Sequence, residues 1–148
     1  MSGEQFDDDY FLRGAETKKS LYSNYRWLHH LTVPMVQVIV AHCGIKKEEC
    51  ILDFGCARGY VVKALRLLGY EAHGTDISEW AIKNADEETK PYLNRFTDNS
   101  FLPAMGFDWI MAKDVLEHIP YVGSTITDLM NAAVKGVFVV VPLAPFDG

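Results

Sequence analysis

The stretch that most constrains this chain runs from Ile51 to Gly59 and reads Ile-Leu-Asp-Phe-Gly-Cys-Ala-Arg-Gly. An apolar run ends in an acid, turns through a glycine-flanked loop and enters a helical pattern. A second run, Glu71 to Thr75, leads to another acid, Asp76. This succession predicts parallel strands joined by helices, because a strand that follows its own helix returns parallel to the first. The carboxyl edge of such a sheet is where a nucleoside-bearing cofactor binds.

The same alternation continues along the chain. We expect strands at 50–55, 71–75, 92–97, 108–112 and 137–141, and helices at 32–44, 60–68, 78–85 and 125–134. The first helix has Thr32 as a cap, Pro34 in its first turn and Gly44 at its exit, although its β-branched residues leave a strand as an alternative. The fold class predicted is α/β, a Rossmann-like and mostly parallel sheet of about five strands flanked by helices.

The last expected strand, Val137 to Val141, consists of five consecutive apolar β-formers. Such a run is typical of an interior strand with neighbours on both sides. The sequence ends at Gly148, seven residues later, so this strand would be an exposed edge. We therefore expect a fragment of a longer protein, with self-association through the exposed fifth strand as the alternative.

The length, charge and cysteine content of the chain argue against several classes of protein. With 148 residues, the chain has the size of one domain. A net charge of -6 argues against a nucleic-acid partner or an anionic membrane surface, and no apolar run approaches the length of a membrane span. The three cysteines form no C-x-x-C pair and no signal peptide opens the chain, which together favour a reduced, cytoplasmic protein.

Residues 1–30 form an aromatic-rich arm without a clear period, and residues 31–148 the cofactor-binding domain, expected to be incomplete at its C-terminus. The arm is interpreted either as a tail that docks by its aromatic side chains or as a lid over the cofactor or substrate. The pair His29-His30 is interpreted as a surface pair, since adjacent side chains diverge on any regular element. No metal site is predicted.

Asp53 separates two classes of cofactor. A pyrophosphate is anionic and requires helix N-terminal amides without a nearby carboxylate. S-adenosylmethionine carries an ammonium group and a sulfonium and no phosphate, so the Asp53 carboxylate attracts it. The loop also lacks the third glycine that a dinucleotide needs. Both arguments favour S-adenosylmethionine over NAD.

Asp76 suits a ribose, because an ionised carboxylate accepts both ribose hydroxyls in charge-assisted hydrogen bonds. Ile77, the next residue, is expected to lie against the adenine. The alternative for Asp76 is a helix cap, but Ser78 is the better candidate for that position.

The residues from Ile51 to Gly59 resemble motif I of the class I S-adenosylmethionine-dependent methyltransferases. The stretches His73–Ser78 and Phe107–Ile119 resemble the family's acid-bearing second strand and its fourth strand with the following exit. The resemblance covers roughly residues 45–142. It departs from the family at Ala57, where glycine is usual, and in sheet size, because the family has seven strands and the last two are lacking here.

The resemblance implies further contacts with S-adenosylmethionine or its product S-adenosylhomocysteine. The loop residues Gly55, Cys56, Ala57 and Gly59 would face the methionine part. Asp98 and Asn99 would reach the adenine amino group, although an ordinary turn fits them equally. Lys113 and Asp114 end the fourth strand, at the carboxyl edge where ligands bind.

The predicted function is methyl transfer to an unidentified acceptor, a small molecule or a glycan precursor. The alternative is a cofactor-binding core without independent activity; an NAD-dependent oxidoreductase is disfavoured. His118 is the candidate general base, with a structural histidine as the alternative. Tyr25 and Trp27 are expected on the substrate side if the arm folds over it.

Overall fold

The computed structural model of the protein describes residues 2–98, 102 and 106–143. Its centre is a sheet in which all described pairings are parallel and the strand order is β3-β2-β1-β4-β5. The strands are β1 (Cys50–Phe54), β2 (Glu71–Asp76), β3 (Leu93–Arg95), β4 (Trp109–Lys113) and β5 (Gly136–Val140). The expected Rossmann-like α/β class is therefore confirmed.

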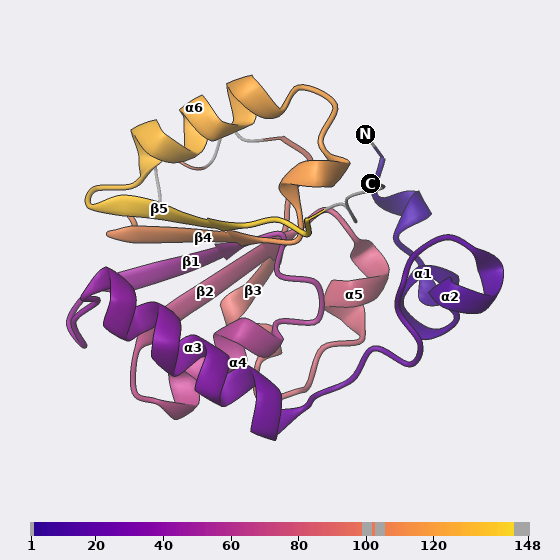
Figure 1. Ribbon diagram of the computed structural model, residues 1–148, viewed down its shortest axis with the longest axis horizontal. Coiled ribbons are helices and arrows are strands. Elements are labelled where there is room, and N and C mark those ends of the chain that lie inside the picture. Colours follow the sequence, from indigo (N-terminus) through magenta and orange to yellow (C-terminus); the bar gives the residue numbers. More distant parts are fainter. Residues whose placement is uncertain (1, 99–101, 103–105, 144–148) are drawn as a thin grey trace.

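Helices cover both faces of this sheet (Figure 1). The helices α3 (His29–Cys43) and α4 (Tyr60–Leu67) pack on one face, and α6 (Val122–Ala132) packs on the other. The short α5 (Glu79–Lys83) follows β2. The described residues also include three single-turn 3-10 helices: η1 (Gly3–Gln5), η2 (Lys90–Tyr92) and η4 (Leu116–His118).

The side chains of β1 alternate between the two layers. Ile51 is buried in the cluster that contains Val36 of α3, whereas Leu52 and Phe54 are buried in the cluster that contains Leu129 of α6. A strand covered on both faces needs apolar residues at odd and even positions alike. This is why the run reads as continuously apolar until Asp53 interrupts it near the carboxyl end.

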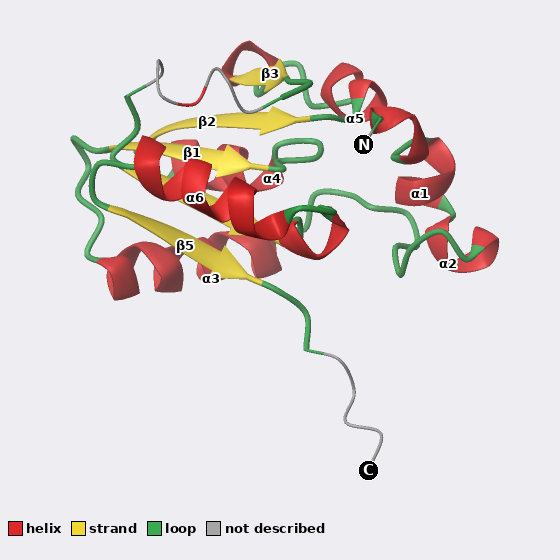
Figure 2. Ribbon diagram, turned by 90° about the horizontal axis from the view of Figure 1, so that it is seen from above, coloured by secondary structure: helices red, strands yellow, loops and turns green. Residues whose placement is uncertain are grey.

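The N-terminal arm lies beyond the carboxyl ends of the strands, as Figure 2 shows. It contains α1 (Asp8–Leu12) and α2 (Gly14–Thr17) after η1. Asp7 caps α1, because its side chain accepts a hydrogen bond from the Tyr10 amide at 3.0 Å. The arm thus borders the edge of the sheet where a ligand is expected.

The ends of the helices test the predicted caps. The Ser78 side chain accepts a hydrogen bond from the Ala81 amide at 3.0 Å, which confirms it as the cap of α5. Gly44 ends α3 with a φ of 67°, also as expected. The prediction that Thr32 caps this helix is wrong. The chain is already helical at His29, because the Thr32 amide donates to the Leu28 carbonyl at 2.9 Å.

Strand β5 lies at an edge of the described sheet and pairs only with β4. Its Val139 side chain is 42% exposed, and Val141, which follows the strand, is 47% exposed. Within the described part of the chain, β5 is thus an apolar strand of the kind expected in a sheet interior, but its side chains are partly exposed to solvent.

A buried carboxylate ties the amino ends of the strands together. Glu49, directly before β1, accepts hydrogen bonds from the Trp109 indole at 2.9 Å and from the Lys46 amide at 3.0 Å. It also forms an ion pair with Lys135, directly before β5. These contacts hold the pKa of Glu49 at about 2, because the Lys135 ammonium and the other donors stabilise its ionised form.

Candidate cofactor and acceptor site

The loop between β1 and α4 adopts a backbone that glycine makes accessible. Gly55 has a φ of 78° and Gly59 a φ of 79°. A Cβ atom on Gly55 would lie 2.4 Å from the Val115 side chain, and one on Gly59 would lie 2.7 Å from the Leu93 side chain. Both glycines are therefore required by space as well as by conformation.

Ala57 lies in the same loop and has a φ of 50°, in the left-handed region. The family resemblance placed glycine here, and alanine is strained at this φ because its Cβ approaches the following carbonyl. The Ala57 amide donates a hydrogen bond to Oδ2 of Asp76 at 2.7 Å. The strained residue therefore joins the loop to the acid at the end of β2.

Asp76 is buried, with 8% of its surface exposed. Its second oxygen, Oδ1, accepts a hydrogen bond from the Ser78 amide at 2.8 Å. Burial raises the pKa of Asp76, and the amides of Ser78 and Ala57 partly oppose that rise. The carboxylate is thus fixed in orientation at the wall of the cavity that it lines, and each oxygen keeps a further lone pair.

Asp53 is buried more deeply and is 3% exposed. Burial, together with the nearby Asp76 carboxylate, raises its pKa to about 7, and the Lys113 ammonium partly opposes this rise. None of the described residues donates a hydrogen bond to the Asp53 carboxylate. Two carboxyl groups therefore lie at neighbouring strand ends in surroundings that favour a cationic ligand over an anionic one.

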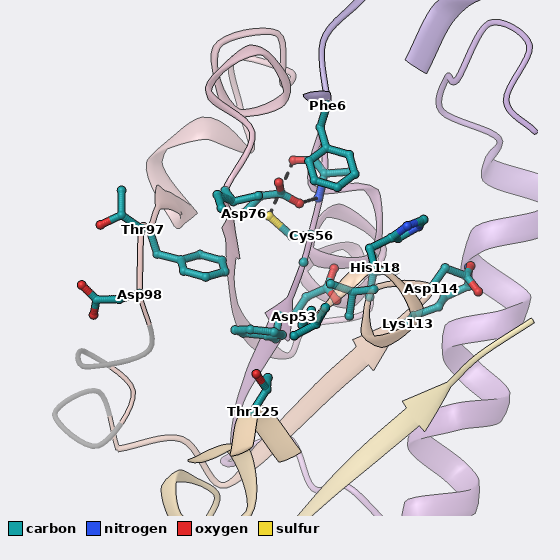
Figure 3. Close-up of a pocket in the computed structure, with 18 of the residues that line it drawn as sticks. Phe6, Asp53, Cys56, Asp76, Thr97, Asp98, Lys113, Asp114, His118 and Thr125 are labelled. Atoms are coloured by element: carbon teal, nitrogen blue, oxygen red, sulfur yellow. Dashed lines mark hydrogen bonds and ion pairs between the residues drawn. The ribbon is translucent and has the colours of Figure 1, made fainter. Parts of the chain in front are cut away.

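These groups border one cavity of about 910 Å³ (Figure 3). It lies at the carboxyl edge of the sheet, and its volume is at the upper end of that usual for small-molecule sites. It brings together most of the residues predicted for the site: Tyr25, Asp53, Gly55, Cys56, Ala57, Asp76, Ile77, Asp98, Lys113, Asp114 and His118.

Two predicted residues are not among the described residues that line it. Gly59 is the last residue of the loop before α4, and its amide donates to the Cys56 carbonyl at 2.8 Å. Trp27 packs on the helix layer, with its ring 5.8 Å from that of Tyr60. Asn99 lies outside the described residues.

The end of β4 contributes a charged pair to the cavity. Lys113 and Asp114 form an ion pair, and the Asp114 amide donates to the Val140 carbonyl of β5 at 2.9 Å. Asp114 has a φ of 52°, a conformation that Asp tolerates better than most residues. Strain of this kind is found where the surrounding structure holds a functional residue in place.

The arm supplies part of the cavity wall, and the sequence did not identify these residues as lining ones. Phe6, Tyr10, Phe11 and Tyr22 all line the cavity. Their aromatic character was visible, but their lack of a period gave no indication of which face they cover. The arm both docks by its aromatic side chains and borders the cavity, so it has features of each of the two interpretations.

Hydrogen bonds attach the arm to the sheet edge, and two of them involve Ser78 and His118. The Ser78 hydroxyl donates to the Phe6 carbonyl at 2.5 Å. The Tyr10 hydroxyl lies 3.2 Å from Nε2 of His118. His118 keeps 38% of its side chain exposed and lines the cavity, so its ring is accessible to a ligand there.

Neither a metal site nor a membrane-spanning helix is found in the described part of the chain. Within residues 2–98, 102 and 106–143, no group of three or more His, Cys, Asp or Glu side chains is placed to hold a metal ion. His29 and His30 are both exposed at the start of α3. Over the same residues, no helix has the length and apolar character that a membrane crossing requires.

A parallel sheet with two buried acids beside a glycine-containing loop defines an α/β protein suited to a nucleoside-bearing ligand. Comparison with known families identifies the class more closely. The chain belongs to the methyltransferase domain family, whose model matches residues 27–146, and its fold is that of the class I S-adenosylmethionine-dependent methyltransferases.

Several solved structures share this fold. YcgJ from Bacillus subtilis is 20% identical with a TM-score of 0.62, over 80% of this chain and 53% of that one. An S-adenosylmethionine-dependent methyltransferase from Archaeoglobus fulgidus is 19% identical with a TM-score of 0.58, over 77% of this chain and 52% of that one. Coclaurine N-methyltransferase, bound to N-methylheliamine and S-adenosylhomocysteine, is 16% identical with a TM-score of 0.60, over 73% of this chain and 35% of that one.

The chain therefore spans about half of the first two proteins and about a third of the last. A search of the curated proteins finds no significant match.

Proposed function

We propose that this chain binds S-adenosylmethionine and takes part in methyl transfer to a small molecule or a glycan precursor. The observation that carries the proposal is the pair Asp53 and Asp76, two buried carboxyl groups that line one cavity. A buried, unpaired acid is costly in an empty site, and a cationic ligand offsets that cost. S-adenosylmethionine has two positive groups, whereas a dinucleotide would bring only negative phosphates to the same place.

The proposed roles follow from the chemistry of each group. Asp53 would attract the ammonium group of the methionine part, directly or through water. Asp76, held by two backbone amides, would accept the ribose hydroxyls. Ile77 and Asp98 line the cavity and would contact the adenine, with Asn99 as the further candidate from the sequence. The backbone of the Gly55–Gly59 loop would border the methionine part.

The bound cofactor supplies an electrophilic methyl group attached to a neutral leaving group. What the protein must contribute is orientation and exclusion of water. Phe6, Tyr10 and Tyr25 of the arm would exclude water from the cavity that they line. His118 would accept a proton where the acceptor must lose one, and its hydrogen bond with Tyr10 would orient the ring.

A small acceptor is favoured over a nucleic acid by the charge of the chain. The net charge is -6, and the main cavity is bordered by five aspartates, which would repel a phosphate backbone: Asp53, Asp76, Asp98, Asp114 and Asp128. Among the structural neighbours, coclaurine N-methyltransferase is bound to a small molecule, N-methylheliamine.

The experiment that tests the proposal is calorimetric titration of the chain with S-adenosylhomocysteine and, separately, with NAD. We expect the first to bind and the second not to bind. Asp76→Ala should weaken binding at least tenfold, about 1.4 kcal/mol, because the ribose hydroxyls lose their acceptor. The control is Glu87→Ala, an acid whose side chain is 88% exposed. Unchanged affinity in Asp76→Ala, or tight binding of NAD, would contradict the assignment.

A second candidate function is a cofactor-binding core without independent activity. It is favoured by one observation, that the chain spans only 35–53% of the three structural neighbours described above. The two candidate functions predict different results in a methyl-transfer assay. Cofactor binding together with methyl transfer to any member of a small-molecule acceptor panel would support the first, and binding without transfer to any of them would support the second.

A further inference from the structure

A second cavity, of about 350 Å³, adjoins the main one. Its wall is built from the end of the arm, the first turns of α3 and the start of α4. Four residues border both cavities: Tyr22, Tyr25, Val61 and Lys113. The two spaces therefore meet beside the carboxyl end of β4, next to the position proposed for the methionine part of the cofactor.

The lining of the second cavity is largely apolar. Leu28, Leu31 and Met35 contribute aliphatic surface, and the rings of Tyr22, Tyr25 and Tyr60 contribute aromatic surface. Leu31 is 57% exposed, so this apolar surface is open to a ligand rather than filled by the fold. The volume lies at the lower end of the range for small-molecule sites, about 300–1,000 Å³.

The ionised groups of the second cavity are all cationic. Lys113 stands at the junction with the main cavity, and Arg26, an exposed residue, stands at the outside. None of the described residues that border this cavity is an Asp or a Glu. Lys113 is already paired with Asp114, whereas no described residue forms an ion pair or hydrogen bond with the Arg26 side chain. The free positive charge is therefore at the outer end.

The two tyrosines that border both cavities add no negative charge to the second one. Burial raises the pKa of Tyr22 to about 12 and that of Tyr25 well above its usual range. Both hydroxyls therefore keep their protons at neutral pH. The main cavity has the opposite character, with five aspartates against one lysine.

We infer that the second cavity binds the methyl acceptor and that the acceptor is a compact aromatic or aliphatic carboxylate. Its carboxylate pairs with Arg26, its apolar body lies against Leu31 and Met35, and its reactive end reaches the junction at Lys113. The inference rests on the proposed methyltransferase function. It goes further in naming the substrate class. The main cavity is lined mainly by acids and suits a cationic cofactor, whereas the second cavity is lined by cations and suits an anionic acceptor.

The test uses two matched probes, 4-hydroxyphenylacetate and its uncharged amide. Their binding to the chain is measured by calorimetry in the presence of saturating S-adenosylhomocysteine. We expect the carboxylate to bind at least tenfold more tightly than the amide. Arg26→Gln should abolish this preference, and Arg13→Gln, which changes an exposed arginine outside both cavities, should keep it. Equal binding of the two probes to the unmodified chain would overturn the inference.

Two tryptophan substitutions on α3 test the location. Leu31→Trp fills the second cavity, so probe affinity should fall at least tenfold while the affinity for S-adenosylhomocysteine stays unchanged. Val38→Trp lies two turns further along the same helix, is 69% exposed and is outside the cavity, so it should change neither. Retained probe affinity in Leu31→Trp would overturn the inference.

The same titrations separate the two proposals. If S-adenosylhomocysteine failed to bind, the proposed function would be contradicted, and the acceptor role of the second cavity would fall with it even if the carboxylate bound. If S-adenosylhomocysteine bound and neither probe did, only the acceptor inference would be overturned.

Discussion

At the scale of single residues, Asp53 is a buried carboxyl group whose ionisation is costly. Its pKa is raised to about 7, whereas an unfolded aspartate titrates near 4. The folded state therefore binds more protons than the unfolded state between about pH 4 and pH 7, and stability falls as pH rises through that window. Well above pH 7, the Asp53 carboxylate is ionised, and none of the described residues forms a hydrogen bond or ion pair with it.

We therefore predict that Asp53→Asn raises the free energy of unfolding at pH 8 by about 2 kcal/mol and weakens S-adenosylhomocysteine binding. Urea denaturation as a function of pH measures the first effect, and the decline between pH 4 and 7 should become shallower. Asp8→Asn, on the exposed side of α1, serves as the control. A variant that was less stable than the unmodified chain at pH 8 would contradict this explanation of the raised pKa.

The raised pKa of Asp53 also predicts how the affinity for a cationic ligand changes with pH. A cationic ligand favours ionised Asp53, so its binding releases a proton wherever the carboxyl group is protonated beforehand. The affinity of the chain for S-adenosylmethionine should therefore increase from pH 6 to pH 8 and then level off. Titrations in two buffers of different ionisation enthalpy would measure the released proton. An affinity that did not vary with pH would count against a role for Asp53 in binding.

Ala57 is the residue at which the loop departs from its family pattern, and its φ of 50° makes that departure costly. Ala57→Gly should stabilise the fold by about 0.5–1 kcal/mol, since the relief of left-handed strain exceeds the extra backbone entropy of glycine. Ala41→Gly, at an exposed helical position of α3, should instead destabilise it by about 1 kcal/mol. Loss of stability in both variants would show that Ala57 is not strained.

At the scale of elements, Glu49 connects the amino ends of three strands. It directly precedes β1 and contacts Trp109 of β4 and Lys135, the residue before β5. Its pKa is lowered to about 2 in the folded chain, so its stabilising effect is present above the unfolded value near 4.3 and is lost as pH falls toward 2. Glu49→Gln should unfold at a lower urea concentration at pH 7 and lose part of this acid dependence. Glu48→Gln, one residue earlier and exposed, is the matched control.

The elements themselves were largely predictable because each carries its own signal. Strand β1 is apolar on both faces, Gly44 ends α3, and Ser78 caps α5, all as local rules require. The start of α3 was missed because Leu28, an apolar residue without a capping side chain, precedes it. The sign of φ at Ala57 was also beyond prediction, since loop geometry decides it and the residue type does not.

At the scale of the whole molecule, the arm is held by aromatic contacts over long sequence distances. The ring of Phe11 is stacked on that of Trp80 at 5.4 Å, and Tyr10 reaches His118, which is 108 residues away. Local sequence patterns do not encode such pairs. Of the arm residues that line the main cavity, only Tyr25 was therefore predicted, whereas most of those at the strand ends were.

We predict that Phe11→Ala releases the arm, because removal of a buried phenylalanine typically costs about 3–5 kcal/mol. Trypsin should then cleave at Lys18, Lys19 and Arg26 several-fold faster, while the sheet domain survives as a resistant core. Leu12→Ala, the neighbouring and 37% exposed position, should leave the cleavage rate unchanged. Equal rates in the two variants would show that Phe11 does not hold the arm in place.

The crowded packing behind the glycine-containing loop has a consequence for protein engineering. A Cβ atom on Gly74 would lie 2.8 Å from the sulfur of Cys56, and Gly55 and Gly59 are equally confined. Variation in this part of the sheet edge therefore destroys the scaffold before it changes specificity. Libraries intended to accommodate bulkier acceptors should instead vary Ser23, Arg26 and Leu31, which border the second cavity and whose exposed side chains can change in size without displacing a strand.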